Sequence, residues 1–493
     1  MVVSQQRRLL VTVLVVLAMG IATAFTSSPS VAGGRAAALA GSDPRPNIVF
    51  ITTDDMRVGD LWAMPNVRQL LTQQGTTFTN SYASFPLCCP ARASWVTGQY
   101  GHNHGVMGNQ SPDFPEGGYA ALDASSTIAT WLKNAGYQTA FVGKYLNYYG
   151  MVKPVTVPPG WQEWHASVGG GNYFFTRLRE TNGTSTLATH TYDGTYQVDL
   201  YDKLATDIIK RRVPSDVPLF LWVSQYAPHG GTPTEADDPP ILTPAVPPRY
   251  RNYFAGESLR TDPSYNEADV SDKPSFIRSR NRLTTAMQAM LKESYQQRLE
   301  SLKAVDDSVG HIVSTLAATG ELDNTVVAFS SDNGYMMGEH RLHAGKSVAY
   351  EPSSRVPLIM RGPGFPAGRS RAAWVANVDV APTFADLANT TPGLKVDGRS
   401  LLPLAVDPAG WAHRTLVFEA GPKSIGGTDR YHGIRDGSYK YVEHSTGEVE
   451  MYNLATDPYE LVNLIGDPSY NSKQAALHER LQRMEYCAGL LCR

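Results

Sequence analysis

Short apolar runs alternate with helical segments through most of the chain, and this alternation limits the fold more than any other feature. Runs typical of buried strands lie at 47–52, 76–81, 138–142, 219–224, 325–330, 356–360 and 374–378. Helices are expected at 65–74, 126–134, 200–212, 291–319 and 382–388. Strands that alternate with helices form parallel sheets covered on both faces. We therefore predict the α/β class, with a mostly parallel central sheet flanked by helices.

Other parts of the chain depart from this pattern. Gly310 falls inside the helix expected at 291–319 and suggests a break there. Residues 151–197 are rich in Gly, Thr and aromatics without a clear period, so we expect irregular chain or excursion strands. Residues 230–280 are dense in Pro, Asp and Ser, which predicts a long surface insertion that helps to shape a pocket.

The pattern of predicted secondary structure changes after residue 410. Short strands are expected between Gly and Asp turns at 415–420, 432–435, 439–444 and 448–452, followed by a helix at 473–485. We therefore predict a catalytic domain over 46–410. An α+β subdomain over 411–493 would hold a small antiparallel sheet and a terminal helix.

The N-terminus has the features of an export signal. Arg7 and Arg8 precede an apolar run at 9–25, and small residues follow at 30–32, so we predict a signal peptide over 1–32 and a linker over 33–45. A transmembrane anchor is the alternative, but the run is short for one. The protein is thus expected to be secreted, periplasmic or extracellular, with no stable membrane anchor. Sec and twin-arginine export both stay open.

Composition sets the remaining limits. The 493 residues are 42% hydrophobic and 18% charged, which is ordinary for a globular protein. The formal net charge of −3 gives no general attraction to nucleic acid, so no nucleic-acid partner is expected. Any affinity for an anion must therefore be local.

Acidic and amide side chains follow two of the predicted strands. Asp54 and Asp55 come after the first, and Asp332 and Asn333 follow the strand at 325–330. Carboxyl ends of parallel strands meet at one edge, where open α/β sheets place their sites. Either pair alone is more often a turn or helix cap. Both pairs together favour a site for Ca²⁺ or Mg²⁺, which prefer oxygen ligands.

The segment 86–105 carries a spaced set of residues, C-x-P-x-R-x4-T-G, formed by Cys88, Pro90, Arg92, Thr97 and Gly98. Pro90 suits a first helical turn and Gly98 a helix end. Cys88 is then expected just ahead of a helix N-terminus, which favours negative charge. Arg92, one turn in, offers a planar fork to an oxyanion. The set predicts a site for a tetrahedral anion, and a merely buried or disulfide-bonded cysteine pair is the alternative.

The chain has four cysteines. Cys487 and Cys492 lie close together at the C-terminus, and an exported chain permits a disulfide between them. Two free thiols are the alternative. The bridge would leave Cys88 and Cys89, and adjacent cysteines bridge each other poorly.

The pattern at Cys88 resembles the signature of the type I sulfatases, within the alkaline-phosphatase-like superfamily, and the resemblance covers nearly the whole chain after the signal peptide. It implies that a formylglycine-generating enzyme oxidises Cys88 to formylglycine, an aldehyde that hydrates to a geminal diol. It also implies that Asp54, Asp55, Asp332 and Asn333, together with residue 88, hold a metal, commonly calcium, with magnesium as the alternative.

The same resemblance assigns sulfate-binding and catalytic roles to Arg92, Lys144, His229 and Lys346. Lys144 and His229 follow two further predicted strands, and Lys346 lies in the stretch 338–351, which is similar to the one that carries the family's second lysine. By resemblance, the basic groups neutralise charge in the transition state. His229, alone or with Lys346, protonates the leaving alcohol.

One position departs from the family. Many members have histidine two residues after the first lysine, where this chain has Leu146. The string GKYLN at 143–147 instead resembles the glucosamine-6-sulfatase branch and the extracellular heparan endosulfatases. By resemblance, that histidine helps the sulfated intermediate to break down, and Asn147 and His104 are the candidates for this role in the present chain. Three other histidines are held only as pocket candidates: His102, His340 and His343.

Taken together, the sequence predicts a secreted sulfatase. Its substrate would be a sulfate monoester, either of a sugar such as N-acetylglucosamine 6-sulfate or of an aryl alcohol. A phosphonate or phosphate ester hydrolase of the same superfamily is the first alternative. A catalytically dead carbohydrate-binding protein is the second.

Overall fold

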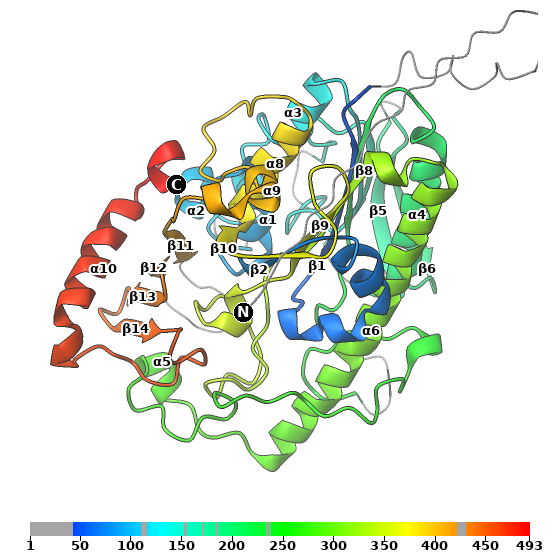
Figure 1. The fold of residues 1–493 in the computed structure, drawn as a ribbon. Helices are drawn as coiled ribbons and strands as arrows, with labels where there is room; N and C mark the ends of the chain where they lie inside the picture. The colour runs from blue at the N-terminus through cyan, green and yellow to red at the C-terminus, as the bar shows by residue number, and fades with distance from the viewer. Residues whose placement is uncertain are drawn as a thin grey trace, which may run out of the picture. The chain divides into compact units, whose positions relative to one another are not determined.

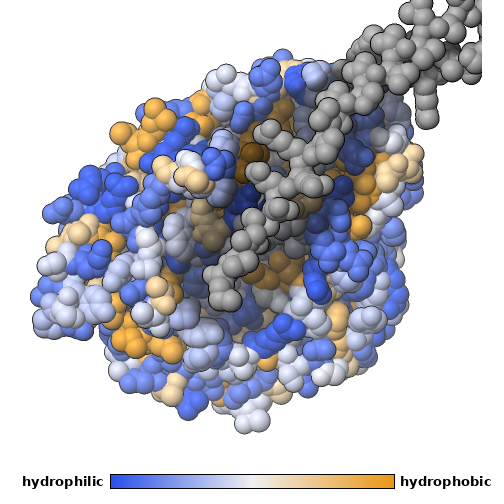
Figure 2. Space-filling model, in the orientation of Figure 1, coloured by the Kyte–Doolittle hydropathy of each residue, from blue (hydrophilic) through white to orange (hydrophobic). Residues whose placement is uncertain are grey.

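The computed structural model describes residues 43–109, 116–151, 155–169, 172–183, 186–232, 235, 238–421 and 430–493. The predicted signal peptide and residues 33–42 of the predicted linker lie outside them. Asp43–Arg493 form one compact unit, and the division that we expect within it at residue 410 stays a prediction. None of the helices in the described part of the chain has both the length and the apolar character that a membrane span requires. On the face drawn in Figure 2, hydrophobic residues occur in separate patches among hydrophilic ones.

A ten-stranded sheet forms the centre of this unit. Across the sheet the strands are β10 (Arg369–Ala376), β2 (Gly75–Tyr82), β9 (Leu358–Arg361), β8 (Thr325–Ser331), β1 (Asn47–Thr53), β7 (Leu219–Ser224), β3 (Gln138–Gly143), β4 (Glu163–Ser167), β5 (Phe175–Thr181) and β6 (Ala188–Asp193). The central strands β8, β1, β7, β3 and β4 are parallel neighbours, as are β10 and β2. The inserted strand β9 and the edge strands β5 and β6 run antiparallel to their neighbours. The predicted mostly parallel sheet is confirmed.

Helices cover both faces of this sheet (Figure 1). The helices are α1 (Cys88–Thr97), α2 (Gly101–His104), α3 (Ile128–Asn134), α4 (Gln197–Arg212), α5 (Ser275–Arg278), α6 (Thr285–Ala318), α7 (Glu351–Ser354), α8 (Val380–Leu387), α9 (Leu402–Val406) and α10 (Asn471–Met484). Strand β1 shows how the two layers arise. Ile48 and Phe50 pack in the cluster of α1, α3 and α8, whereas Val49 and Ile51 pack in the cluster of α4 and α6. Successive side chains of a strand point to opposite faces, so an unbroken apolar run serves both.

The C-terminal region forms the predicted small sheet. Its four antiparallel strands are β11 (Leu416–Ala420), β12 (Tyr431–Asp436), β13 (Tyr439–His444) and β14 (Val449–Asn453). Helix α10 packs on this sheet through Leu477 and Leu481 (Figure 1). A disulfide joins Cys487 and Cys492, with Cα atoms 5.2 Å apart.

The region 151–197 is more regular than its composition suggests, because it holds β4, β5 and β6. Its buried side chains are partly polar, and this hides the strand pattern. His165 is buried between Glu163 and Glu180, with its ring nitrogens 3.2 Å and 2.7 Å from their carboxylate oxygens. Burial disfavours the imidazolium, but the two carboxylates outweigh it and raise the pKa of His165. Arg212 also binds Glu163, at 2.6 Å. Strands β4 and β5 are therefore joined by an ion pair as well as by backbone hydrogen bonds, and a second ion pair joins helix α4 to β4.

Two helix predictions were wrong in detail. Helix α6 runs without interruption from Thr285 to Ala318, so there is no break at Gly310. A Cβ at Gly310 would lie 3.0 Å from the Asn66 side chain, so this glycine permits close packing rather than ending the helix. The segment expected as a helix at 65–74 contains a π-helical stretch, Val67–Thr72. The backbone N–H of Val67 donates to the Asp306 carboxylate of α6 at 2.9 Å.

Candidate active site

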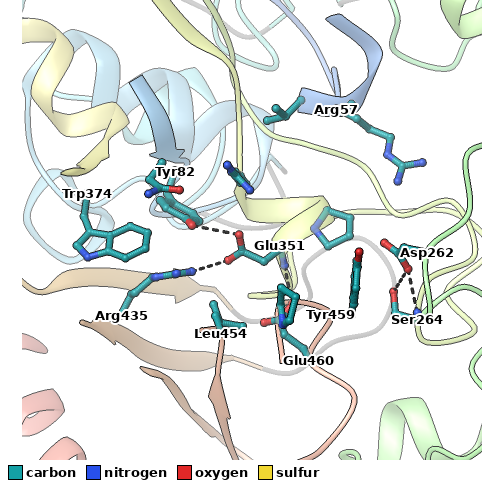
Figure 3. A pocket seen from close by; sticks show the side chains of 16 residues that line it. Arg57, Tyr82, Asp262, Ser264, Glu351, Trp374, Arg435, Leu454, Tyr459 and Glu460 are labelled. Carbon is teal, nitrogen blue, oxygen red and sulfur yellow. Dashed lines mark hydrogen bonds and ion pairs between the residues drawn. The ribbon is translucent and has the colours of Figure 1, made fainter. Parts of the chain in front are cut away.

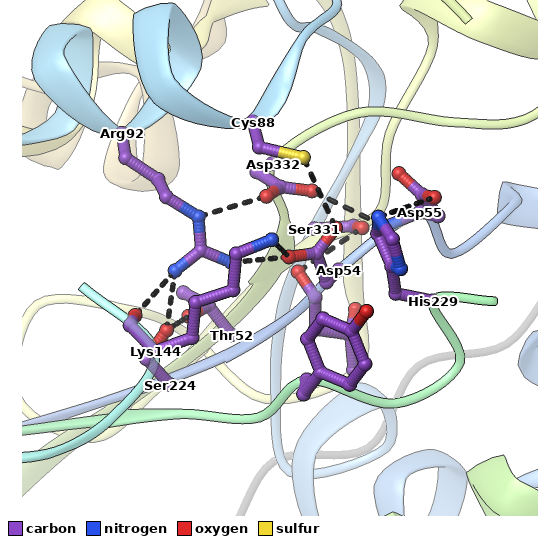
Figure 4. A network of polar contacts seen from close by, with 12 residues as sticks. Thr52, Asp54, Asp55, Cys88, Arg92, Lys144, Ser224, His229, Ser331 and Asp332 are labelled. Carbon is purple, nitrogen blue, oxygen red and sulfur yellow. Dashed lines mark hydrogen bonds and ion pairs between the residues drawn. The ribbon is translucent and has the colours of Figure 1, made fainter. Parts of the chain in front are cut away.

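The two acidic pairs predicted from the sequence lie side by side at the carboxyl ends of β1 and β8 (Figure 4). Asp54, Asp55, Asp332 and Asn333 are at most 1% exposed. The amide nitrogen of Asn333 donates to the Asp55 carboxylate at 2.6 Å, and the backbone N–H of Asp55 donates to Asp332 at 3.2 Å. Because β1 and β8 are parallel neighbours, residues 277 positions apart become direct partners.

Cys88 is the first residue of α1, not the residue just ahead of it as expected. Its free, buried thiol lies 3.3 Å from Asp54 Oδ1 and 2.7 Å from Lys346 Nζ. Leu87, at the N-cap, has no side chain that can cap the helix. Asn109 supplies that contact from a distant loop, because its side-chain oxygen accepts a hydrogen bond from the Cys89 N–H at 2.8 Å. Sequence reasoning missed Asn109.

Arg92 links four parts of the site and is fully buried. Its Nε donates to Asp332 at 2.9 Å and one terminal nitrogen donates to Asp54 at 3.1 Å. The other terminal nitrogen donates to the Lys144 carbonyl and the Ser224 hydroxyl, both at 2.6 Å. A planar guanidinium suits this role, since its donors lie in a fixed fork. Arg92 therefore orients the acids rather than lying free for an anion.

Two lysines from separate loops lie near different oxygens of Asp54, Lys144 near Oδ2 and Lys346 near Oδ1. Lys144 follows Gly143, the last residue of β3, and forms an ion pair with Asp54. Gly143 has φ 113°, and a Cβ there would lie 2.0 Å from the Ser224 carbonyl oxygen, so only glycine fits. Lys346 forms an ion pair with Asp55 and lies 3.8 Å from Asp54 Oδ1.

His229 follows β7 at the rim of the site, with 22% of its side chain exposed. Its Nδ1 lies 2.7 Å from the Gly230 carbonyl oxygen, so in the neutral ring Nδ1 carries the proton and Nε2 is free to accept. Nε2 lies 3.8 Å from the Asp55 carboxylate. The ring also contacts Tyr226, with 4.6 Å between centroids. His229 thus directs an acceptor nitrogen toward the acidic cluster.

The buried charges perturb one another strongly. Burial opposes ionisation of Asp54, but Lys144, His229, Lys346 and Arg92 together hold its pKa well below the usual range. Burial and the charge of Asp54 raise the pKa of Asp332 to about 6. Burial, then Asp54, raise the pKa of the Cys88 thiol to about 12. The carboxylates therefore compete for the positive charge that the chain supplies.

The residues present fit a hard divalent cation. Asp54, Asp55, Cys88 and His229 each offer one ligand atom, and these four atoms lie within 4.8 Å of one another. The side-chain oxygen of Asn333 is buried and accepts no hydrogen bond from the described residues. Carboxylate and amide oxygens are the ligands that Ca²⁺ and Mg²⁺ prefer. Asp332 would complete the set.

Two residues proposed for the missing histidine lie in different places. Asn147 lines a cavity of about 420 Å³ together with Lys144 and His229. His104 is buried elsewhere on α2: its Nε2 lies 3.1 Å from the Ser94 hydroxyl, and its Nδ1 accepts from the backbone N–H of Val106 at 3.0 Å. Both ring nitrogens of His104 are thus used in local contacts, so the structure does not bring it to the site.

The remaining pocket candidates also have structural partners or lie apart. His102 pairs with Glu419, and His340 lies 2.6 Å from the Glu267 carboxylate. His343 lines a separate cavity beside Arg280. None of these three histidines contacts the acidic cluster within the described residues.

A second cavity, of about 590 Å³, lies beside the C-terminal sheet (Figure 3). None of the predicted site residues is among the described residues that line it. Its central carboxylate, Glu351, accepts from the Tyr82 hydroxyl at 3.1 Å and from Arg435 at 2.8 Å. The charges there compensate one another, so we place the chemistry at the acidic cluster.

Comparison with known proteins now identifies the family. The model of the Sulfatase family matches residues 46–390, which is more than half of the chain. The chain belongs to the sulfatase family. The model "N-sulphoglucosamine sulphohydrolase, C-terminal" also matches this sulfatase, over 338–486. The family and the fold class predicted from the sequence are thus confirmed, while the roles of individual site residues stay predictions.

Similar proteins extend the comparison. N-acetylglucosamine-6-sulfatase of Capra hircus is 30% identical over 494 residues, covering 91% of this chain and 85% of the relative. The extracellular sulfatase SULF-1 homolog of Drosophila melanogaster is 36% identical over 369 residues, covering 73% of this chain. The matched part is only 31% of that longer relative. A protein solved in complex with its substrate D-glucosamine-2-N,6-O-disulfate has a TM-score of 0.74 at 24% identity, covering 90% of this chain and 97% of that one, which shows the shared fold.

Proposed function

We propose that the protein is an exported enzyme that hydrolyses sulfate monoesters of a sugar, such as N-acetylglucosamine 6-sulfate. One observation carries the proposal. The Cys88 sulfur lies at the first turn of α1, within hydrogen-bond distance of Lys346 and Asp54 and beside the acidic cluster. The goat relative's name and the GKYLN string at 143–147 favour a sugar ester. An aryl sulfate is the second candidate.

The proposal includes two groups that the chain must acquire. Oxidised to formylglycine by a maturation enzyme and hydrated, residue 88 supplies one hydroxyl that attacks sulfur and a second that releases sulfate. Asp54, Asp55, Asp332 and Asn333, together with residue 88, would hold a divalent cation, which would supply Lewis-acid polarisation of the sulfuryl oxygens and of the attacking hydroxyl. The donor set fits calcium, with magnesium as the alternative.

Basic side chains of the protein itself would stabilise the negative charge of the transition state. Lys144 and Lys346 lie near different oxygens of Asp54, so both ammonium groups border the place where the ester's anionic head would lie. Arg92 fixes Asp54 and Asp332 in position. Preorganised charge of this kind usually contributes most to catalysis, and loss of one donor costs on the order of 10²–10³ in turnover.

His229 is placed to act on the leaving group. It lines the cavity of about 420 Å³ with Lys144, Tyr226 and Asn147. We propose that this cavity receives the alcohol part of the ester, because its volume is suitable for a small ligand. His229 first takes up a proton from solvent at its free Nε2 and then donates that proton to the ester oxygen as the bond to sulfur breaks.

Export also belongs to this proposal. The predicted signal peptide over 1–32 supports it, as does the name of the extracellular relative from Drosophila. Passage through a secretory route is compatible with the disulfide between Cys487 and Cys492.

A turnover panel tests the function. Protein whose Cys88 peptide carries the aldehyde by mass spectrometry is given N-acetylglucosamine 6-sulfate, nitrophenyl sulfate and a nitrophenyl phosphonate monoester, with Cys88→Ala as the control. We expect sulfate release by the wild type and none by Cys88→Ala. Faster turnover of the phosphonate than of any sulfate ester would point to the rival hydrolase. Unmodified cysteine throughout, with no turnover, would favour a carbohydrate-binding protein.

A further inference from the structure

One buried arginine, Arg298, has no part in the proposed reaction but contacts the backbone of the acidic cluster at Asp55. Arg298, on α6, is 1% exposed, and no carboxylate of the described residues lies within ion-pair distance of it. Burying a charge without an ionic partner is costly, so such a group needs compensation from other contacts. The contacts of Arg298 show where that compensation comes from.

The guanidinium touches three loops, each of which follows a different strand of the central sheet. One terminal nitrogen donates to the carbonyl oxygen of Asp55, after β1. The other donates to the carbonyl oxygen of Pro228, after β7, at 3.0 Å. The planar group also lies 4.5 Å from the ring centroid of Tyr335, in the loop that follows β8.

Each contact lies next to a residue of the proposed site. Asp55 is itself a predicted metal ligand, Pro228 directly precedes His229, and Tyr335 comes two residues after Asn333. Arg298 is thus the neighbour that the three loops share, on a helix that supplies none of the predicted site residues.

The backbone at Asp55 adds a second argument. Its φ is 69°, a left-handed conformation that residues other than glycine adopt rarely. This conformation aims the Asp55 side chain at Lys346 and Asn333. A hydrogen bond to the Asp55 carbonyl helps to hold that strained peptide in place.

The chemistry of arginine suits this role better than that of lysine. Two donors on one rigid plane can bind two carbonyl oxygens and leave the face of the plane for an aromatic ring. A lysine ammonium has no fixed fork and cannot hold two loops at a set separation.

We propose that Arg298 is a positioning residue that holds Asp55 and His229 at the correct separation for metal binding and catalysis. It acts through backbone carbonyls and does not touch the substrate. The inference rests on the proposed function for its activity readout, but not for its structural and metal-binding readouts.

The test compares Arg298→Lys and Arg298→Met with Arg371→Lys. Arg371, on edge strand β10, is a matched control, because its guanidinium also donates to two backbone carbonyl oxygens. These are the oxygens of Leu404 at 2.9 Å and Ala405 at 3.1 Å. Three readouts are taken on each folded protein: Ca²⁺ affinity by calorimetry with calcium chloride, amide hydrogen exchange of peptides spanning 54–56 and 228–230, and kcat and KM for nitrophenyl sulfate.

We expect both Arg298 variants to lose on the order of 10- to 100-fold in Ca²⁺ affinity or in kcat, as partners of ligand-bearing groups commonly do. Exchange should rise in both peptides, KM should change little, and Arg371→Lys should match the wild type. If Arg298→Met does not fold, Arg298→Lys decides.

Wild-type calcium affinity, exchange and kcat in the folded Arg298 variants would overturn the inference. A wild-type protein that bears the aldehyde but releases no sulfate would instead overturn the proposed function. The exchange and calcium measurements would still decide the role of Arg298 in that case.

Discussion

Replacing Arg92 by lysine keeps one buried positive charge and removes the fork that ties the site together. Arg92 donates to Asp332 at 2.9 Å, to Asp54 at 3.1 Å, and to Ser224 and the Lys144 carbonyl at 2.6 Å each. A lysine side chain ends one bond short of the terminal guanidinium nitrogens. Its ammonium therefore cannot reach both strand ends and both carboxylates at once, and we expect at least two of these hydrogen bonds to be lost.

The magnitude follows from those contacts. A hydrogen bond to a charged group contributes about 1.5–3 kcal/mol, so two lost bonds correspond to about 3–6 kcal/mol. Because the lysine keeps the positive charge, the variant does not lose the full free energy that leaving Asp54 and Asp332 without a cationic partner would cost. Since folded proteins are stable by only about 5–15 kcal/mol, the loss would be large.

Urea denaturation followed by tryptophan fluorescence measures this difference in the free energy of unfolding. The same preparations give kcat for nitrophenyl sulfate, which should fall because Asp54 and Asp332 lose their orientation. Arg371→Lys serves again as the control with an unchanged site. An Arg92→Lys variant within about 1 kcal/mol of the wild type, with full turnover, would show that the fork does not organise the site.

Three further predictions test other parts of the account. Gly143→Ala would put a carbon 2.0 Å from the Ser224 carbonyl oxygen, displacing the adjoining lysine and lowering kcat on the order of 100-fold; unchanged kcat would contradict this. Asn333→Ala removes an oxygen ligand, so calorimetry should show at least about tenfold weaker Ca²⁺ binding, and equal affinity would exclude it as a ligand. The raised pKa of His165 means that its imidazolium stabilises the fold fully below about pH 6.5 and loses this effect as the pH rises through the raised value. The melting temperatures of the wild type and His165→Gln should therefore converge as the pH rises above about 6.5, whereas a constant gap would refute the assignment.

The central sheet and the acidic cluster were predictable because the signals for them are local. An unbroken apolar run indicates a strand that is buried on both faces, and β1 and β8 are runs of this kind. The polar residues that end those runs had to meet once the strands were parallel neighbours. The positions of Asp54 and Asp332 follow from that reasoning.

What the sequence did not predict depends on distant contacts. Excursion strands were one of two alternatives for 151–197, but their bounds were hidden because the buried faces of β4 and β5 carry His165, Glu163 and Glu180, whose charges compensate one another only after folding. The continuity of α6 at Gly310 depends on its packing against Asn66. No local pattern reports such pairs.

The residues missed at the site have the same explanation. Arg298 lies within the apolar stripe of α6, and its partner Asp55 is 243 positions away. Asn109 lies 20 positions from Cys89 in an irregular segment. His104 shows the opposite error, since its motif position suggested the site but its ring is used by Ser94 and Val106.

The most direct test of the central claim is a crystal structure of the protein grown with calcium chloride and examined for anomalous scattering. The account predicts one calcium ion about 2.3–2.6 Å from oxygens of Asp54, Asp55, Asp332 and Asn333, with density for an oxidised side chain at residue 88. A calcium ion bound elsewhere, or a saturated protein with none between these four residues, would contradict it.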